Sequence, residues 1–86
     1  MSYKEDIASL VPEEDADEVI GYIEETEEEL EKYFRQEVGK KTGMAKKVLT
    51  ALVASKTDLS REEISETVGS AMEKMEEMYE EKLDKF

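Results

Sequence analysis

Apolar residues recur along this chain at helical spacing. Steps of three and four residues separate them over most of the length, and no useful stretch alternates apolar and polar residues as a strand does. We therefore predict an all-α fold, a three- to four-helix bundle in a single helical domain. That domain covers residues 1–86, with helices at about 2–11, 13–38, 44–54 and 60–85.

Capping and breaking residues set the predicted ends of these helices. Ser2 and Ser60 each precede a glutamate by three residues, which is the spacing of a capping box. Pro12 separates the first two helices, because a helix tolerates proline only in its first turn. The segment from Gly39 to Gly43 reads GKKTG and is the clearest break in the chain, so we expect one helix to end before it and another to begin after it.

The third predicted helix, residues 44–54, is the most apolar segment. Its large apolar residues cover much of the helix circumference, and they are Met44, Val48, Leu49, Leu52 and Val53. We expect it to be a short central helix that is flanked by two long acidic helices, one on each side. Each long helix would span about 35–40 Å at about 1.5 Å per residue, more than twice the central one. Their ends would extend beyond the core, so we expect self-association into a homodimer.

Methionine and aromatic side chains form the expected partner surface. On the last helix, Met72, Met75 and Met78 recur at a spacing of three residues. Such a stripe packs either in the core or against a partner, and methionine suits an adaptable partner groove. The complete predicted partner or oligomer interface is Tyr33, Phe34, Met72, Met75, Met78, Tyr79 and Phe86.

The charge pattern divides the chain into three parts. The formal net charge is -12, from 12 Lys+Arg and 24 Asp+Glu. Residues 1–34 carry 2 basic and 13 acidic side chains, residues 35–56 carry 6 and 1, and residues 57–86 carry 4 and 10. Two acidic segments therefore enclose a basic, apolar centre. High net charge is typical of disordered chains, but the helical periodicity and the single Pro favour a packed protein.

The basic centre has two interpretations. Most charge runs are solvated faces, so its side chains can simply neutralise the neighbouring acidic helices. Alternatively, two glycines, two lysines and a threonine just before a helix N-terminus form an anion site. GKKTG lacks the spacing of a phosphate-binding loop, and no strand precedes it, which argues against nucleotide binding. The candidate anion contacts are Arg35, Lys40, Lys41, Lys46 and Lys47.

Missing residue types exclude several kinds of chemistry. The chain has no Cys and no His, which excludes metal sites built on thiolate or imidazole and the Ser-His-Asp and Cys-His catalytic sets. The carboxylates between Glu13 and Glu31 lack the ligand pattern of an EF-hand, and exposed glutamate rows do not form the cleft that paired catalytic carboxylates need. We expect no enzymatic activity, no catalytic residue, no cofactor and no metal.

Three non-enzymatic functions remain. The one we favour is a protein–protein interaction module of adaptor or regulatory kind. The second is a nucleic-acid mimic, because carboxylate rows on a rigid helix imitate a phosphate backbone and compete for basic DNA-binding proteins. No apolar run reaches the ~20 residues of a membrane span, and the N-terminus lacks a signal-peptide core. We therefore expect a cytoplasmic protein with no membrane contact.

The third function follows from a resemblance over residues 48–75. This run resembles the helix-turn-helix pattern of winged-helix regulators at Leu59-Ser60, Glu63-Ile64, Val68-Gly69 and Met75. The resemblance implies a turn near Gly69 followed by a helix that reads DNA. That helix is rich in glutamate, which phosphates repel, so nucleic acid is not the partner we expect. One uninterrupted helix from Ser60 onward explains the same residues.

Overall fold

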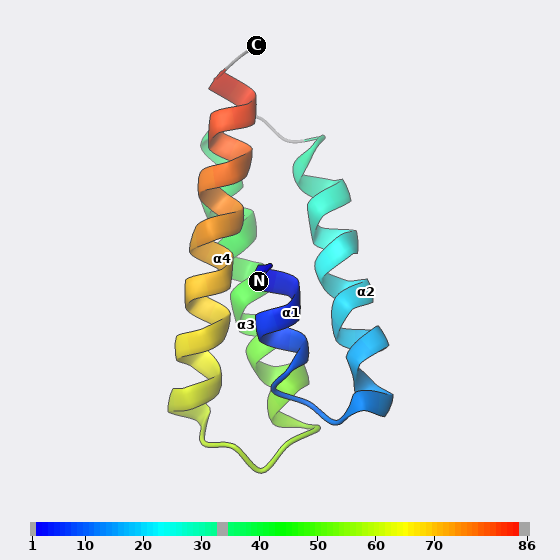
Figure 1. The fold of residues 1–86 in the computed structure, drawn as a ribbon. Coiled ribbons are helices and arrows are strands. Elements are labelled where there is room, and N and C mark those ends of the chain that lie inside the picture. The colour runs from blue at the N-terminus through cyan, green and yellow to red at the C-terminus, as the bar shows by residue number, and fades with distance from the viewer. Residues whose placement is uncertain (1, 33–34, 85–86) are drawn as a thin grey trace.

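Four α-helices make up the described part of the chain: α1 (Tyr3–Ala8), α2 (Glu13–Leu30), α3 (Arg35–Ala54) and α4 (Arg61–Asp84). The computed structural model describes residues 2–32 and 35–84, and these residues contain no strand. Successive helices run in opposite directions, and the short α1 packs against both α2 and α4 (Figure 1). The predicted all-α fold is confirmed.

Helix α1 is shorter than the sequence predicts, and it docks against the other helices. Ser2 caps it, because its Oγ accepts the backbone N–H of the residue three positions later at 3.3 Å. The helix ends at Ala8, and the chain then turns towards Pro12, which disfavours helical backbone in the residue before it. Tyr3 and Ile7 are buried, so α1 is held on the core by its own apolar face.

The reversal between α2 and α3 lies earlier than predicted. The expected helix over residues 13–38 and the break at residues 39–43 are both wrong, because α2 ends at Leu30 and α3 begins at Arg35. Nor is α3 short: its 20 residues make it about 30 Å long. Since α2 has 18 residues and α4 has 24, the described helices lack the predicted overhang of long helices beyond a short one.

Packing on one face explains why α3 continues through its two glycines. Val38, Thr42 and Ala45 are buried at spacings of four and three residues, so the core-facing stripe crosses the GKKTG segment. Neither glycine has a positive φ, so neither ends the helix as a left-handed cap. Gly39 also lies close to α4, since a Cβ built there would be 2.9 Å from Glu76 Oε1. The end of the Glu76 side chain from α4 therefore occupies the space beside Gly39.

Helix α4 is continuous from Arg61 to Asp84. Ser60 caps it as predicted, because Ser60 Oγ accepts the backbone N–H of Glu63 at 3.2 Å. The helix passes through Gly69 without a turn. Residues 48–75 therefore do not form the helix-turn-helix geometry that the winged-helix resemblance implied, and the alternative of one uninterrupted helix is correct.

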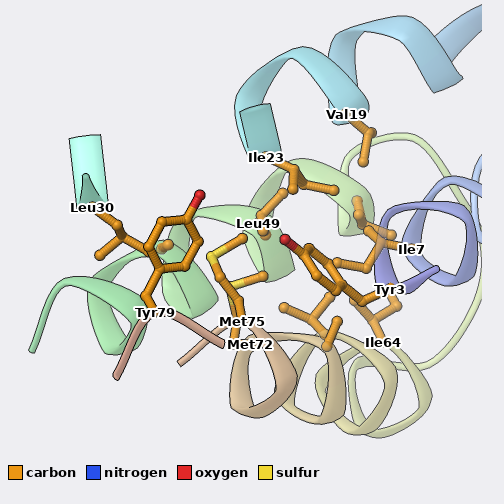
Figure 2. Close-up of a cluster of buried hydrophobic side chains, with 14 of the residues drawn as sticks. Tyr3, Ile7, Val19, Ile23, Leu30, Leu49, Ile64, Met72, Met75 and Tyr79 are labelled. Atoms are coloured by element: carbon orange, nitrogen blue, oxygen red, sulfur yellow. The ribbon is translucent and has the colours of Figure 1, made fainter. Parts of the chain in front are cut away.

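The core combines apolar side chains from all four helices. Figure 2 shows them meeting between the ribbons, and the labelled residues are Tyr3, Ile7, Val19, Ile23, Leu30, Leu49, Ile64, Met72, Met75 and Tyr79. Buried threonines satisfy their hydroxyls within their own helix: Thr42 donates to the Gly39 carbonyl and Thr50 to the Lys46 carbonyl, at 3.1 and 2.7 Å. Among the described residues, no buried polar side-chain atom lacks a hydrogen-bond partner.

Three residues of the predicted partner interface belong to this core instead. Met72, Met75 and Tyr79 are 3%, 0% and 6% exposed, so the fold of a single chain already covers them (Figure 2). Helical periodicity marked them correctly as apolar contacts but did not say against what they pack. Among the predicted interface residues that the structure describes, only Met78 is exposed, at 51%. Tyr33, Phe34 and Phe86 lie outside the described residues.

Candidate protein-binding face

The outer side of α3 carries the main exposed apolar surface. Four large hydrophobic side chains are more than a third exposed in the described part of the chain, and they are Met44, Val48, Leu59 and Met78. Met44 and Val48, at 57% and 47%, are one helical turn apart and therefore share a face. Leu59 lies in the loop before α4, and Met78 lies on α4. Only the α3 pair forms a stripe.

Ion pairs at two levels tie this side of α3 to α2. Lys41 Nζ lies 2.7 Å from Glu29 Oε2, near the start of α3. Lys56 Nζ, just beyond the end of α3, lies 2.6 Å from Glu18 Oε2 and 3.6 Å from Asp15 Oδ1. The two helices run antiparallel between these bridges, so the middle of α2 stands beside the middle of α3 (Figure 1).

The apolar stripe continues inwards at this junction. Leu52 follows Val48 by one turn and is partly buried against the core, as is Tyr22 of α2. Leu52 therefore continues the line of Met44 and Val48 along α3 into the core. The exposed stripe is therefore the outer edge of the hydrophobic core and is continuous with it.

Charges of opposite sign lie on the two sides of the stripe. Lys40 and Lys47 are exposed on α3, four residues before and three residues after Met44. Glu25 is exposed on α2, between the two bridges to α3. Neither Lys47 nor Glu25 forms an ion pair with another residue in the described part of the chain. We call Met44, Val48, Lys40, Lys47 and Glu25 together the α3 face.

The remaining predicted anion contacts have other surroundings. Lys41 pairs with α2, which supports the interpretation that the basic segment neutralises an acidic neighbour. The end of the Lys46 side chain lies over α4, 3.3 Å from where a Cβ on Gly69 would be. The GKKTG segment is inside α3, so the predicted anion site ahead of a helix N-terminus is not formed there. The Arg35 side chain lies outside the described part of the structure.

Shifted pKa values occur where helices contact each other. The Tyr3 hydroxyl donates a hydrogen bond to Glu27 of α2, and burial together with this bond raises the pKa of Tyr3. Lys4 Nζ lies 3.0 Å from Glu27 Oε1, and this contact raises the pKa of Lys4. The ion pairs of Lys56 with α2 raise its pKa, and burial raises the pKa of Tyr79. Tyr3 and Lys4 thus connect α1 to α2, and Lys56 connects the segment after α3 to α2.

Surface depressions elsewhere are shallow junctions between elements. One lies between α3 and α4 and is lined by both acidic and basic side chains, including Lys46, Arg61 and Glu73. In residues 2–32 and 35–84, no three carboxylates come together in a way that could hold a metal ion. None of the described helices is both long and apolar enough to cross a membrane.

Comparison with family models, with curated proteins and with solved structures gives no match to this chain. The residues of the α3 face are therefore the basis on which a function can be argued. Their chemistry is that of a contact surface: two exposed apolar side chains with charges on either side of them.

Proposed function

We propose that this chain is a non-enzymatic protein–protein interaction module, of adaptor or regulatory kind, that binds its partner through the α3 face. The observation that supports this is the pair Met44 and Val48, which remain 57% and 47% exposed on one side of a helix in a protein of net charge -12. Covering apolar surface is favourable by roughly 25 cal/mol per Å². Apolar surface with a polar rim is typical of protein interaction sites.

We further propose that the four helices act as one bundle that presents this face in a fixed geometry. The acidic helices α2 and α4 would flank α3, which carries 5 of the 12 Lys and Arg residues. The bridges from Lys41 and Lys56 to α2 support a rigid junction beneath the stripe. A pre-organised face binds with a smaller loss of conformational entropy than a mobile one.

A capture experiment with matched variants tests this function. The wild-type chain and the variants Met44→Asp and Met78→Asp are immobilised, and a native lysate is passed over each at low and at high salt. Both positions are about half exposed, so both variants should fold. We expect Met44→Asp to lose the captured protein, Met78→Asp to retain it, and salt to have little effect, because an apolar contact is not screened. Equal capture by all three chains contradicts the proposal.

A second candidate is the nucleic-acid mimic, and the outer side of α2 favours it. Five of its carboxylates are without an ion pair to any described residue, and they are Glu13, Glu14, Asp17, Glu25 and Glu28. Together these carboxylates give the outer surface of one helix a dense negative charge. A mimic would bind a basic DNA-binding protein in competition with DNA, and binding would weaken steeply as salt rises. This binding would not change in Met44→Asp, which distinguishes the mimic from the first proposal.

A further inference from the structure

We propose that the partner of the α3 face is a second copy of this chain, bound with the two α3 helices parallel around a two-fold axis. This proposal rests on the proposed function, because it names the occupant of the same face. It is carried by the way opposite charges are distributed on either side of Met44 and Val48.

The α3 face is complementary to itself. One side of the apolar stripe carries Lys40 and Lys47, and the other side carries Glu25 of α2 together with the paired Lys41. Glu37 is also exposed and lies two turns before Met44, on the line of the stripe itself. The ion pair of Lys41 with α2 fixes which side is acidic, because it holds α2 against one flank of α3. A symmetric dimer interface uses the same patch on both subunits, so a patch with both signs can satisfy itself.

The direction of the two-fold axis decides which charges meet. If the axis lies along α3, the two α3 helices are parallel, and the left side of one face meets the right side of the other. Lys47 of each copy then meets Glu25 of its partner. If the axis lies across α3, the helices are antiparallel and like sides meet, which sets lysine against lysine. Electrostatics therefore favours the parallel arrangement.

The positions of Lys47 and Glu25 along the helices also agree. The bridges of α3 to α2 run from Lys41–Glu29 at one level to Lys56–Glu18 at the other. Moving 6 residues along α3 from the first bridge reaches Lys47, and moving 4 residues back along α2 reaches Glu25. Each is about two fifths of the way to the second bridge. In a parallel pair with Met44 against Met44, the two charges therefore lie at the same level.

The dimer we infer is small and concentration-dependent. Two large apolar side chains from each copy form its centre, which is less than a permanent dimer interface contains. Two copies that each carry a charge of -12 also repel each other at long range. Moderate salt screens that repulsion over distances beyond about 8–10 Å, whereas the close Lys47–Glu25 contacts are screened less.

Charge-exchange variants separate the specific contact from the overall charge. Sedimentation equilibrium is measured from about 10 to about 500 μM at about 150 mM salt, a range suited to a weak, small interface. The variants are Lys47→Glu, Glu25→Lys and the double exchange. Each single variant sets like charges together at two symmetric places, so we expect a dimerisation constant about tenfold weaker, and the double exchange should restore it.

The overall charge predicts the opposite result for one of these variants. Glu25→Lys lowers the net charge from -12 to -10 and so reduces long-range repulsion. If only net charge mattered, this variant would dimerise more strongly. Glu28→Lys, which makes the same change on α2 outside the α3 face, is the matched control and should not weaken the dimer. The three positions changed, Lys47, Glu25 and Glu28, are all exposed, and circular dichroism checks that each variant folds.

Three outcomes overturn the inference: a monomer throughout the concentration range, single variants that do not weaken association, or a double exchange that fails to restore it. These results are distinguishable from failure of the proposed function. If Met44→Asp still abolishes capture of another protein, the face binds a different partner, and only the second copy is excluded. If Met44→Asp changes neither capture nor dimerisation, the α3 face is not an interaction surface at all.

Discussion

Two methionines three residues apart on α4 have opposite environments. Met75 is fully buried, whereas Met78 is 51% exposed. Their sequence context is similar, and both fall on an apolar stripe at helical spacing. A step of three residues turns the helix by about 300°, so a series of such steps moves slowly away from the core. The last methionine in the series has therefore left the face that α1 to α3 cover.

At the same scale, Tyr3 links α1 to α2 and makes stability depend on alkaline pH. Its pKa is raised in the folded protein, so the unfolded chain releases this proton near the ordinary value of 10 while the folded chain retains it. The stabilising contribution is complete below about pH 10 and is lost as pH rises further, by up to about 1.4 kcal/mol per pH unit.

The variant Tyr3→Phe tests this contribution. It lacks the titrating hydroxyl, so we expect its free energy of unfolding to fall less between pH 9 and pH 11 than that of the wild type. At neutral pH it should be less stable by about 1 kcal/mol, because the hydrogen bond to Glu27 is lost. Urea unfolding followed by circular dichroism gives both quantities. Tyr22→Phe is the control, and an equal pH dependence in both variants would refute the role of Tyr3.

At the scale of the elements, the length of α3 determines which residues form the candidate site. Because α3 begins at Arg35, it lies along α4 over most of its length and contacts α2 on another side (Figure 1). Its inner face is filled by Val38, Thr42 and the apolar residues that follow. Met44 and Val48 are thereby turned outwards. A helix that began only at residue 44 would have had fewer inner positions and a different outer face.

Replacing Gly43 by alanine tests the continuity of α3. A Cβ at Gly43 meets nothing within 4 Å, so alanine adds helix propensity without a clash. We expect Gly43→Ala to raise the free energy of unfolding by about 1 kcal/mol, as measured by urea unfolding. Gly39→Ala should gain less, because its Cβ would require the Glu76 carboxylate to move. Destabilisation by Gly43→Ala would instead indicate a left-handed glycine and a loop at this position.

At the scale of the whole molecule, repulsion among the acidic side chains destabilises the folded state more than the ion pairs stabilise it. The four helices bring a charge of -12 into a body of 42 × 22 × 20 Å. The bridges from Lys4, Lys41 and Lys56 to α2 offset part of the repulsion. Exposed pairs of this kind contribute only about 0–1 kcal/mol each. The uncompensated glutamates of α2 and α4 therefore dominate the electrostatic balance.

Added salt should consequently stabilise the protein. We expect the melting temperature to rise between about 10 and about 200 mM sodium chloride, because screening weakens the repulsion among many charges more than it weakens a few ion pairs. Thermal unfolding by circular dichroism at low micromolar concentration measures this on the monomer. A melting temperature that falls over this range would mean that the bridges to α2 contribute more than the repulsion removes.

The sequence alone determined the helical nature of the chain and those helix ends that local chemistry sets. The caps at Ser2 and Ser60 and the proline after α1 act through neighbouring backbone groups, so they are readable without a tertiary structure. The sequence also identified Lys40 and Lys47 as candidate contacts for an anion. These inferences needed only interactions within a few residues.

Only the tertiary structure decided where the chain reverses and which apolar residues remain exposed. Gly39 is compatible with both a helix end and a helix interior, and the burial of Val38, Thr42 and Ala45 on one face of α3 selects the second. Apolar residues surround most of the segment from Met44 to Val53, so periodicity alone could not choose its inner side. The burial of Met75 and the exposure of Met44 follow from which helices lie alongside, and that depends on contacts between residues far apart in the sequence.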